Sequence, residues 1–170
     1  EFHQIDFYGR APYLTEPGMW EELFLGECPD GFGYLLKGRV NDVGYKSITT
    51  PGVVAGFRDA LDRFGSVKWA SLSDAAIAYA RDGFLVRPAL RRWWEHKPQF
   101  GRAGTYDRLT HTPAARALYT RNGAIYEEGE TFVNRDLAET LSLLAKEGPD
   151  YFYSGPMADA MVNDIEANGG

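Results

Sequence analysis

Residues 148–170 read GPDYFYSGPMADAMVNDIEANGG, a stretch that joins a helix break, an aromatic turn and an amphipathic helix. Gly148 suits the position just after a helix because glycine adopts positive φ without steric cost, and Pro149 cannot continue that helix. Beyond Pro156, apolar residues recur at spacings of one, three and four, which predicts one buried stripe: Met157, Ala158, Met161, Val162 and Ile165. We therefore expect this helix to dock on a folded body by that stripe.

Helical patterns also fill most of the chain that precedes this stretch. Thr50 suits an N-cap and Pro51 a first helical turn, and Asn134 suits the cap of a helix that runs to Glu147. The predicted helices begin near residues 51, 73, 88, 113, 134 and 156, and the inward residues of the second are Ala75, Ala76, Tyr79 and Ala80. We expect the segment 98–112 to be polar and irregular.

The first 49 residues favour extended and irregular structure instead. Residues 2–8 alternate imperfectly between apolar and polar side chains, which predicts a strand. A long glycine-rich excursion follows, with one short strand predicted at residues 33–36. We therefore expect an α+β fold of about six helices and a strand fragment, in a single domain over residues 1–170 that divides into a strand and long loop (1–49) and a helical part (50–170).

Composition and charge narrow the classes of function. The chain has 170 residues, of which 44% are hydrophobic, so it has enough apolar side chains for a core. Its net charge of -6 argues against a nucleic-acid partner, and a local group of arginines is typical of a solvated helix face: Arg81, Arg87, Arg91, Arg92 and Arg102. No apolar run is long enough to predict a membrane span, and the compartment stays open.

Four motifs in order resemble the large subunit of γ-glutamyltranspeptidase-like N-terminal nucleophile hydrolases. They are Asp6-Phe7 with Ala11-Pro12, TPGVVAG at 50–56, GETFVNRDLA at 129–138, and the segment 148–170. The resemblance covers nearly all of the chain and implies the helix-rich part of an αββα sandwich. It also implies an enzyme that is made as a precursor and cuts itself, which frees an N-terminal threonine on a complementary small chain.

A terminal threonine carries its own general base, because its α-amino group has a pKa near 8 and can take the hydroxyl proton. Every threonine here is internal, so the resemblance places the nucleophile outside this chain, and no catalytic residue is expected within it. We accordingly expect the sequence to be an internal part of a longer protein. The resemblance implies no cofactor.

The substrate-binding candidates are Tyr8 and Arg10. In family members that use γ-glutamyl groups, an arginine directly after the Asp-Phe pair binds the donor's α-carboxylate. Tyr8 occupies that position here, and Arg10 follows two places later, on the same face if the segment is a strand. Arg10 is therefore either the carboxylate ligand or an ordinary surface arginine, and a related acylase or amidase of different acyl specificity is an alternative function.

The sequence gives less support to other candidate sites. The three histidines and Cys28 lack metal-ligand spacing, so we expect no metal site, and Cys28 is expected to be a packed or partly exposed thiol rather than a nucleophile. Adjacent Trp93 and Trp94 point to different faces of a helix, which predicts one in the core and one at a surface. A third candidate function for the whole chain is that of a catalytically inert helical module that binds a partner protein.

Overall fold

The structure of the protein, a computed structural model, describes residues 2–170. Within them lie seven α-helices and six strands of two to four residues. The chain forms two compact units, which are described separately below. The first unit comprises residues 2–13, 49–84 and 133–167, and the second comprises residues 14–48, 85–132 and 168–170.

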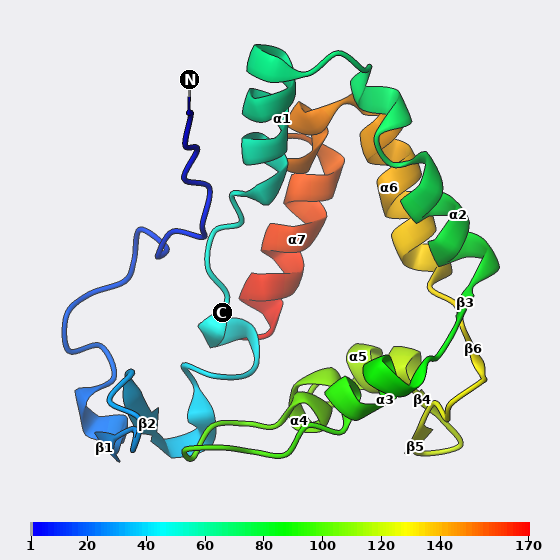
Figure 1. The fold of residues 1–170 in the computed structure, drawn as a ribbon. Coiled ribbons are helices and arrows are strands. Elements are labelled where there is room, and N and C mark those ends of the chain that lie inside the picture. Colours follow the sequence, from blue (N-terminus) through cyan, green and yellow to red (C-terminus); the bar gives the residue numbers. More distant parts are fainter. Residues whose placement is uncertain (1) are drawn as a thin grey trace. The chain divides into compact units, whose positions relative to one another are not determined.

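The first unit is built from four helices: α1 (Val53–Phe64), α2 (Asp74–Asp82), α6 (Arg135–Glu147) and α7 (Pro156–Ala167). Helices α2 and α6 lie side by side (Figure 1), with Ala80, Ala138 and Leu144 buried. A short 3-10 turn, η4 (Trp69–Ser71), leads into α2, and its Trp69 indole N–H donates to the Leu144 carbonyl at 2.7 Å. That bond ties the segment before α2 to the end of α6.

The helix break and amphipathic helix predicted for residues 148–170 are confirmed. Gly148 has φ 90° and its N–H donates to the Leu144 carbonyl at 3.0 Å, after which η5 (Pro149–Phe152) forms the aromatic turn. On α7 the predicted stripe is half-buried except at Val162, which is 51% exposed. The predicted Asn134 cap is also present, because its side chain accepts a bond from the Leu137 N–H at 3.0 Å.

The second unit combines short helices with short strands. Strand β1 (Phe24–Glu27) pairs antiparallel with β2 (Tyr34–Leu36), with a shift of register between Phe24 and Gly26. Single 3-10 turns accompany this hairpin: η1 (Glu21–Leu23), η2 (Lys37–Arg39) and η3 (Tyr45–Ser47). The unit's other elements are α3 (Pro88–Trp94), α4 (Thr105–Leu109), α5 (Pro113–Tyr119), β4 (Thr120–Arg121), β5 (Ala124–Ile125) and β6 (Thr131–Phe132). Strand β3 (Phe84–Leu85) has one residue in each unit.

An aromatic cluster forms the core of the second unit. Val86, Trp94, Ile125 and Phe132 are buried together, and the Trp94 and Phe132 ring centroids are 5.4 Å apart in an edge-on arrangement. Trp93 is 65% exposed, which confirms that only one of the two adjacent tryptophans enters the core. Cys28 is buried and free, as expected for a packed thiol.

Three predictions about local structure are wrong. Residues 2–8 form no strand, because the segment packs on a helix instead of pairing with another strand. Helix α4 lies inside the segment that we expected to be irregular. On α2, Tyr79 is 63% exposed rather than inward, and Ile77 is the half-buried side chain beside Ala80. The first and third errors concern residues whose position is set by packing rather than by local pattern.

Candidate functional site

The segment that carries both substrate-binding candidates lies along helix α1. The Phe7 ring meets the Phe57 ring edge-on at 5.8 Å between centroids, and nearer the start of the chain His3 lies 4.7 Å from Phe64. The segment therefore runs antiparallel to α1, because Phe7 contacts the helix near its start and His3 contacts it at its end. Apolar packing on α1 therefore fixes residues 3–7 in place of a sheet.

Glycines in the segment's surroundings make this close approach possible. A Cβ on Gly52 would lie 2.4 Å from the Phe7 carbonyl oxygen, and a Cβ on Gly56 would lie 2.3 Å from Phe7 Cγ. A Cβ on Gly9 would lie 2.1 Å from the Thr49 hydroxyl oxygen. All three distances are shorter than real carbon contacts, so any side chain at these positions would push the Asp6–Arg10 segment away. Glycine at positions 52 and 56 of the TPGVVAG motif is thus explained by close packing against Phe7.

Arg10 is anchored by its backbone, whereas its side chain is exposed. Its N–H donates to the Thr50 carbonyl at 3.2 Å, and the Thr50 N–H donates to the Arg10 carbonyl at 2.8 Å. Within residues 2–170 the Arg10 guanidinium makes no hydrogen bond or ion pair with another side chain. The structure therefore presents a fixed backbone with a charged group open to a ligand.

Tyr8 is also open to solvent, with 89% of its surface exposed, and its N–H donates to an Asp6 carboxylate oxygen at 3.2 Å. Among the described residues no hydrogen bond joins the Tyr8 and Arg10 side chains. The expectation that the two share one face depended on a strand, and because the segment forms none, that argument does not hold. The structure places Tyr8 and Arg10 on one short segment without bringing their side chains into contact.

The cap of helix α1 differs from the sequence-based expectation. Thr50 is not the N-cap, because its backbone pairs with Arg10, and Gly52 occupies the capping position without a side chain to offer. The Tyr153 hydroxyl takes the place of a capping side chain. It accepts a bond from the Ala55 N–H at 3.0 Å and donates to the Pro51 carbonyl at 3.0 Å. A residue of the last motif thus caps the helix that begins in the second.

Tyr153→Phe should therefore destabilise the protein, because it removes both bonds and leaves the first turn of α1 without a cap. Loss of a cap costs about 0.5–2 kcal/mol, which should lower the melting temperature. Thermal unfolding of the complete protein would measure it. The matched control is Tyr151→Phe, whose hydroxyl makes no hydrogen bond among the described residues. Equal melting temperatures for the two variants would contradict the capping role.

A second candidate site is a cavity of about 870 Å³ that lies wholly within the second unit. Its walls come from the β1–β2 hairpin, the segment that follows it, the loop at 101–102, and residues from α4 and α5. The polar and charged lining residues are Asn41, Asp42, Arg39, Arg102, Asp107, Thr110, His111 and Arg116. The sequence pattern did not reveal this site, because the glycine-rich excursion that forms part of its walls was expected to be mostly irregular.

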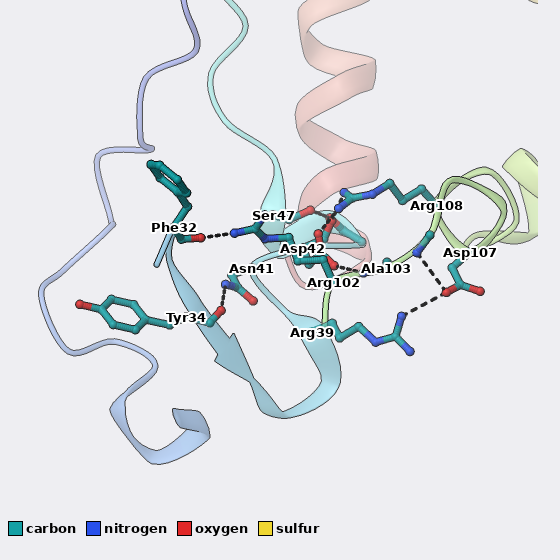
Figure 2. A network of polar contacts seen from close by, with 12 residues as sticks. Phe32, Tyr34, Arg39, Asn41, Asp42, Ser47, Arg102, Ala103, Asp107 and Arg108 are labelled. Atoms are coloured by element: carbon teal, nitrogen blue, oxygen red, sulfur yellow. Dashed lines mark hydrogen bonds and ion pairs between the residues drawn. The ribbon is translucent and has the colours of Figure 1, made fainter. Parts of the chain in front are cut away.

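Ion pairs hold the walls of this cavity together (Figure 2). Arg102 binds Asp30 with two hydrogen bonds of 2.8 and 3.0 Å. Figure 2 shows Arg39 bound to Asp107, at 3.2 Å. Arg108 binds the Asp42 carboxylate as well as its carbonyl oxygen. Each aspartate of the network is therefore bound to one arginine that is distant in the sequence.

The Asp30 carboxylate is held in its ionised form. The Phe32 N–H, which donates to it at 3.0 Å, and the Arg102 guanidinium together lower the pKa of Asp30 below its ordinary value. The stabilisation from this group is present above the ordinary pKa of aspartate and is lost only as pH falls through the lowered value. Asp30 is thus a fixed negative partner for Arg102 at neutral pH.

Most of the arginines assigned to a solvated face also have acidic partners. Arg81 pairs with Asp82 at 2.9 Å, and Arg91 pairs with Glu95 at 2.9 Å and with Glu127 at 3.2 Å. A surface whose cations are neutralised in this way is not a polyanion-binding patch. Two further findings concern the described residues: no three His, Cys, Asp or Glu side chains gather to hold a metal ion, and no helix is long and apolar enough to cross a membrane.

Comparison with known proteins decides the family. The family profile described as gamma-glutamyltranspeptidase matches residues 1–170, the whole chain. The chain belongs to this family. Relatives include glutathione hydrolase 3 of Arabidopsis thaliana, 34% identical over 137 residues that make up 81% of this chain and 20% of the relative. The acylase ACY 1 proenzyme of Pseudomonas sp. strain SE83 is 34% identical over 98% of this chain and 28% of its own length.

The solved structures agree with the family assignment. Helicobacter pylori gamma-glutamyltranspeptidase superposes with a TM-score of 0.78 at 25% identity, over 97% of this chain and 43% of that one. The predicted fold class, a helix-rich α+β part of an N-terminal nucleophile hydrolase, is therefore confirmed. The chain spans 20% of the Arabidopsis relative and 28% of the Pseudomonas relative, so it represents only part of what such proteins contain.

Proposed function

We propose that this chain is a large-chain segment of a self-processing amidohydrolase and acyltransferase of the gamma-glutamyltranspeptidase family. The observation that carries the proposal is the Asp6–Arg10 segment, whose backbone is fixed on α1 and Thr50 while its guanidinium has no partner among the described residues. A fixed arginine without an internal counter-ion suits a substrate carboxylate, because the planar guanidinium can donate two charge-assisted hydrogen bonds. The nucleophile, in this proposal, lies outside the chain.

The proposed chemistry uses the N-terminal threonine of a complementary small chain. Its α-amine takes the hydroxyl proton, the hydroxyl oxygen bonds to the amide carbonyl carbon, and the carbon–nitrogen bond breaks as that proton passes to the leaving amine. The product is an ester-linked acyl-enzyme. Water then releases a carboxylic acid, or an acceptor amine takes the acyl group as a new amide, and the threonine is restored in both cases.

In this scheme the residues of the present chain bind and orient the acyl group. Arg10 would hold the carboxylate of the acyl donor, and the Tyr8 hydroxyl could add one hydrogen bond but no charge. The family position of the carboxylate-binding arginine is filled here by Tyr8, so the binding group is shifted by two residues. We propose that this shift changes the preferred acyl group relative to γ-glutamyl donors.

An acylase of different acyl specificity is the second candidate function. The specific observation in its favour is Tyr8 at the arginine position, together with a relative named as an acylase that matches 98% of the chain. A substrate panel separates the two functions. The complete processed protein would be assayed with γ-glutamyl anilide and with anilides of glutaric acid, which lacks the α-amino group, and of butyric acid, which lacks the second carboxylate.

We expect cleavage of at least one carboxylate-bearing anilide and a much lower kcat/KM for the butyryl compound. Preference for the γ-glutamyl over the glutaryl compound would assign the first function, and the reverse preference would assign the acylase. Equal rates with the butyryl compound would remove the carboxylate site from the proposal. Absence of all turnover would favour the inert partner-binding module.

A further inference from the structure

The cavity of the second unit carries one arginine that no carboxylate of residues 2–170 neutralises. Its two wall aspartates are already occupied, Asp107 by Arg39 and Asp42 by Arg108. The wall arginine Arg102 is likewise paired with Asp30. Every carboxylate of the network is thus paired, and among the described residues Arg116 is the one lining arginine without an acidic partner.

Arg116 is held in position by a neutral group. One guanidinium nitrogen donates to the Thr110 carbonyl at 2.8 Å, and no carboxylate among residues 2–170 forms an ion pair with it. Thr110 is buried, and its own hydroxyl donates to the Tyr106 carbonyl at 2.8 Å, so the acceptor is itself fixed. Since a guanidinium has five N–H donors, most of the Arg116 donors stay free for a ligand.

The helix that carries Arg116 is also fixed at its start. Thr112 caps α5 by accepting a bond from the Ala115 N–H at 3.1 Å, so the first turn of α5 is tied down next to Thr110. The neighbouring lining residue His111 lies against the backbone at Gly44, where a Cβ would stand 3.0 Å from its Nε2. A rigid arrangement of this kind loses little conformational freedom when a ligand binds.

The rest of the lining suits an apolar or aromatic body. Phe32, Tyr34 and Leu25 line the cavity and are 79%, 57% and 68% exposed, so they offer apolar surface that the described chain does not cover. A volume near 870 Å³ lies within the range of pockets that hold drug-sized molecules. A cavity whose lining includes one uncompensated cation and several apolar side chains favours a ligand with one carboxylate and an apolar body.

We propose that this cavity is a binding site for a small organic monocarboxylate with an aromatic or aliphatic body. Arg116 binds the carboxylate through the donors that Thr110 leaves free, and the exposed aromatic side chains contact the body. The proposal is independent of the Arg10 segment, which belongs to the first unit. It assigns the second unit a ligand of its own, either a regulator or a second reactant.

The test uses two probes that contain no amide bond and so cannot be acyl donors: 3-phenylpropanoate and the neutral 3-phenylpropanol. Titration calorimetry on the complete protein in an Arg10→Ala background removes the first candidate site from the measurement. We expect the carboxylate to bind at least about tenfold more tightly than the alcohol, because charge-assisted hydrogen bonds are the strong ones. Arg116→Gln should remove that difference and leave alcohol binding unchanged.

Two further variants make the result decisive. Arg116→Lys keeps the charge and should restore part of the preference, which a purely structural role for Arg116 would not do. Arg92→Gln is the control, because Arg92 is exposed, lies outside the cavity lining and has no ion pair among the described residues. Equal binding of the two probes, or a preference that survives Arg116→Gln, would overturn the proposal. Absence of binding would mean that another part of the complete protein fills the cavity, and would overturn it too.

Discussion

Gly56→Ala is expected to destabilise the protein by about 1–2 kcal/mol, although alanine is the better helix former. In an open helix interior this change would stabilise by about 1 kcal/mol. Here the new Cβ would stand 2.3 Å from Phe7 Cγ and 2.5 Å from Phe7 Cβ, and overpacking of this kind costs about 1–3 kcal/mol. The contacts involve the base of the Phe7 side chain, which no rotation of the ring moves away. The cost of the clash should therefore exceed the gain in helix propensity.

The effect of Gly56→Ala should change sign when the Phe7 side chain is removed, which provides a control. In a Phe7→Gly background the three side-chain atoms of Phe7 that crowd Gly56 are absent, and the same Gly56→Ala change should stabilise by up to about 1 kcal/mol. Melting temperatures of the four proteins in this cycle would measure both steps. If Gly56→Ala raised the melting temperature in the presence of Phe7, the seating of residues 3–7 on α1 would be wrong.

Arg10→Ala is expected to raise KM for a carboxylate-bearing amide about 10- to 100-fold with little change in kcat. The magnitude follows from the loss of charge-assisted hydrogen bonds worth about 1.5–3 kcal/mol, and the pattern follows because binding of a remote carboxylate is the same in the ground state and the transition state. Steady-state kinetics of the complete processed protein would test it. A substrate without the carboxylate should show no change in KM.

Three variants sharpen the assignment of Arg10. Arg135→Ala is the matched control, since Arg135 is exposed on α6 and has no ion pair among the described residues. Tyr8→Phe should raise KM by a smaller factor than Arg10→Ala, because its hydroxyl contributes one uncharged hydrogen bond. Tyr8→Arg in the Arg10→Ala background should recover much of the binding if the two positions serve one site. Unchanged kinetics in Arg10→Ala would remove Arg10 from the substrate site.

The sequence predicted helices well wherever the pattern was long enough to reveal a period. The caps at Asn134 and the break at Gly148 lie within a few residues of the groups that they bind, so local sequence contains the whole signal. Helix α4 has only five residues, which is too short to show a period, and it is supported by the Asp107 carboxylate that accepts a bond from the Gly104 N–H at 3.4 Å. Its existence could not be read from apolar spacing.

The errors about the first segment and helix α1 have a different cause. Alternation in residues 2–8 is compatible with a strand, but a strand also needs a partner, and the described part of the chain gives this segment a helix surface instead. Thr50 has the chemistry of a cap, yet the bond to Arg10 occupies its backbone and a tyrosine 98 residues from Ala55 does the capping. A local sequence pattern cannot predict hydrogen bonds between residues so far apart in the chain.

The candidate sites were predictable to unequal degrees. Tyr8 and Arg10 were found through family motifs, and their roles as ligands stay predictions. The cavity of the second unit was missed because its walls join residues far apart in the chain: Arg102 and Asp30 are separated by 72 positions. A surplus of arginine and aspartate in residues 30–42 and 102–116 was the available signal. The single-domain organisation expected from composition also stays a prediction.

The most direct test of the proposed function is intact-mass spectrometry of the complete protein, before and after incubation with a carboxylate-bearing amide. We predict two chains, a small one that begins with threonine and a large one that contains residues 1–170. After incubation the small chain should gain the mass of the acyl group, while the large chain should not change. A single uncut chain, or an acyl group attached to the large chain, would contradict the proposal that these residues bind the substrate for a nucleophile located elsewhere.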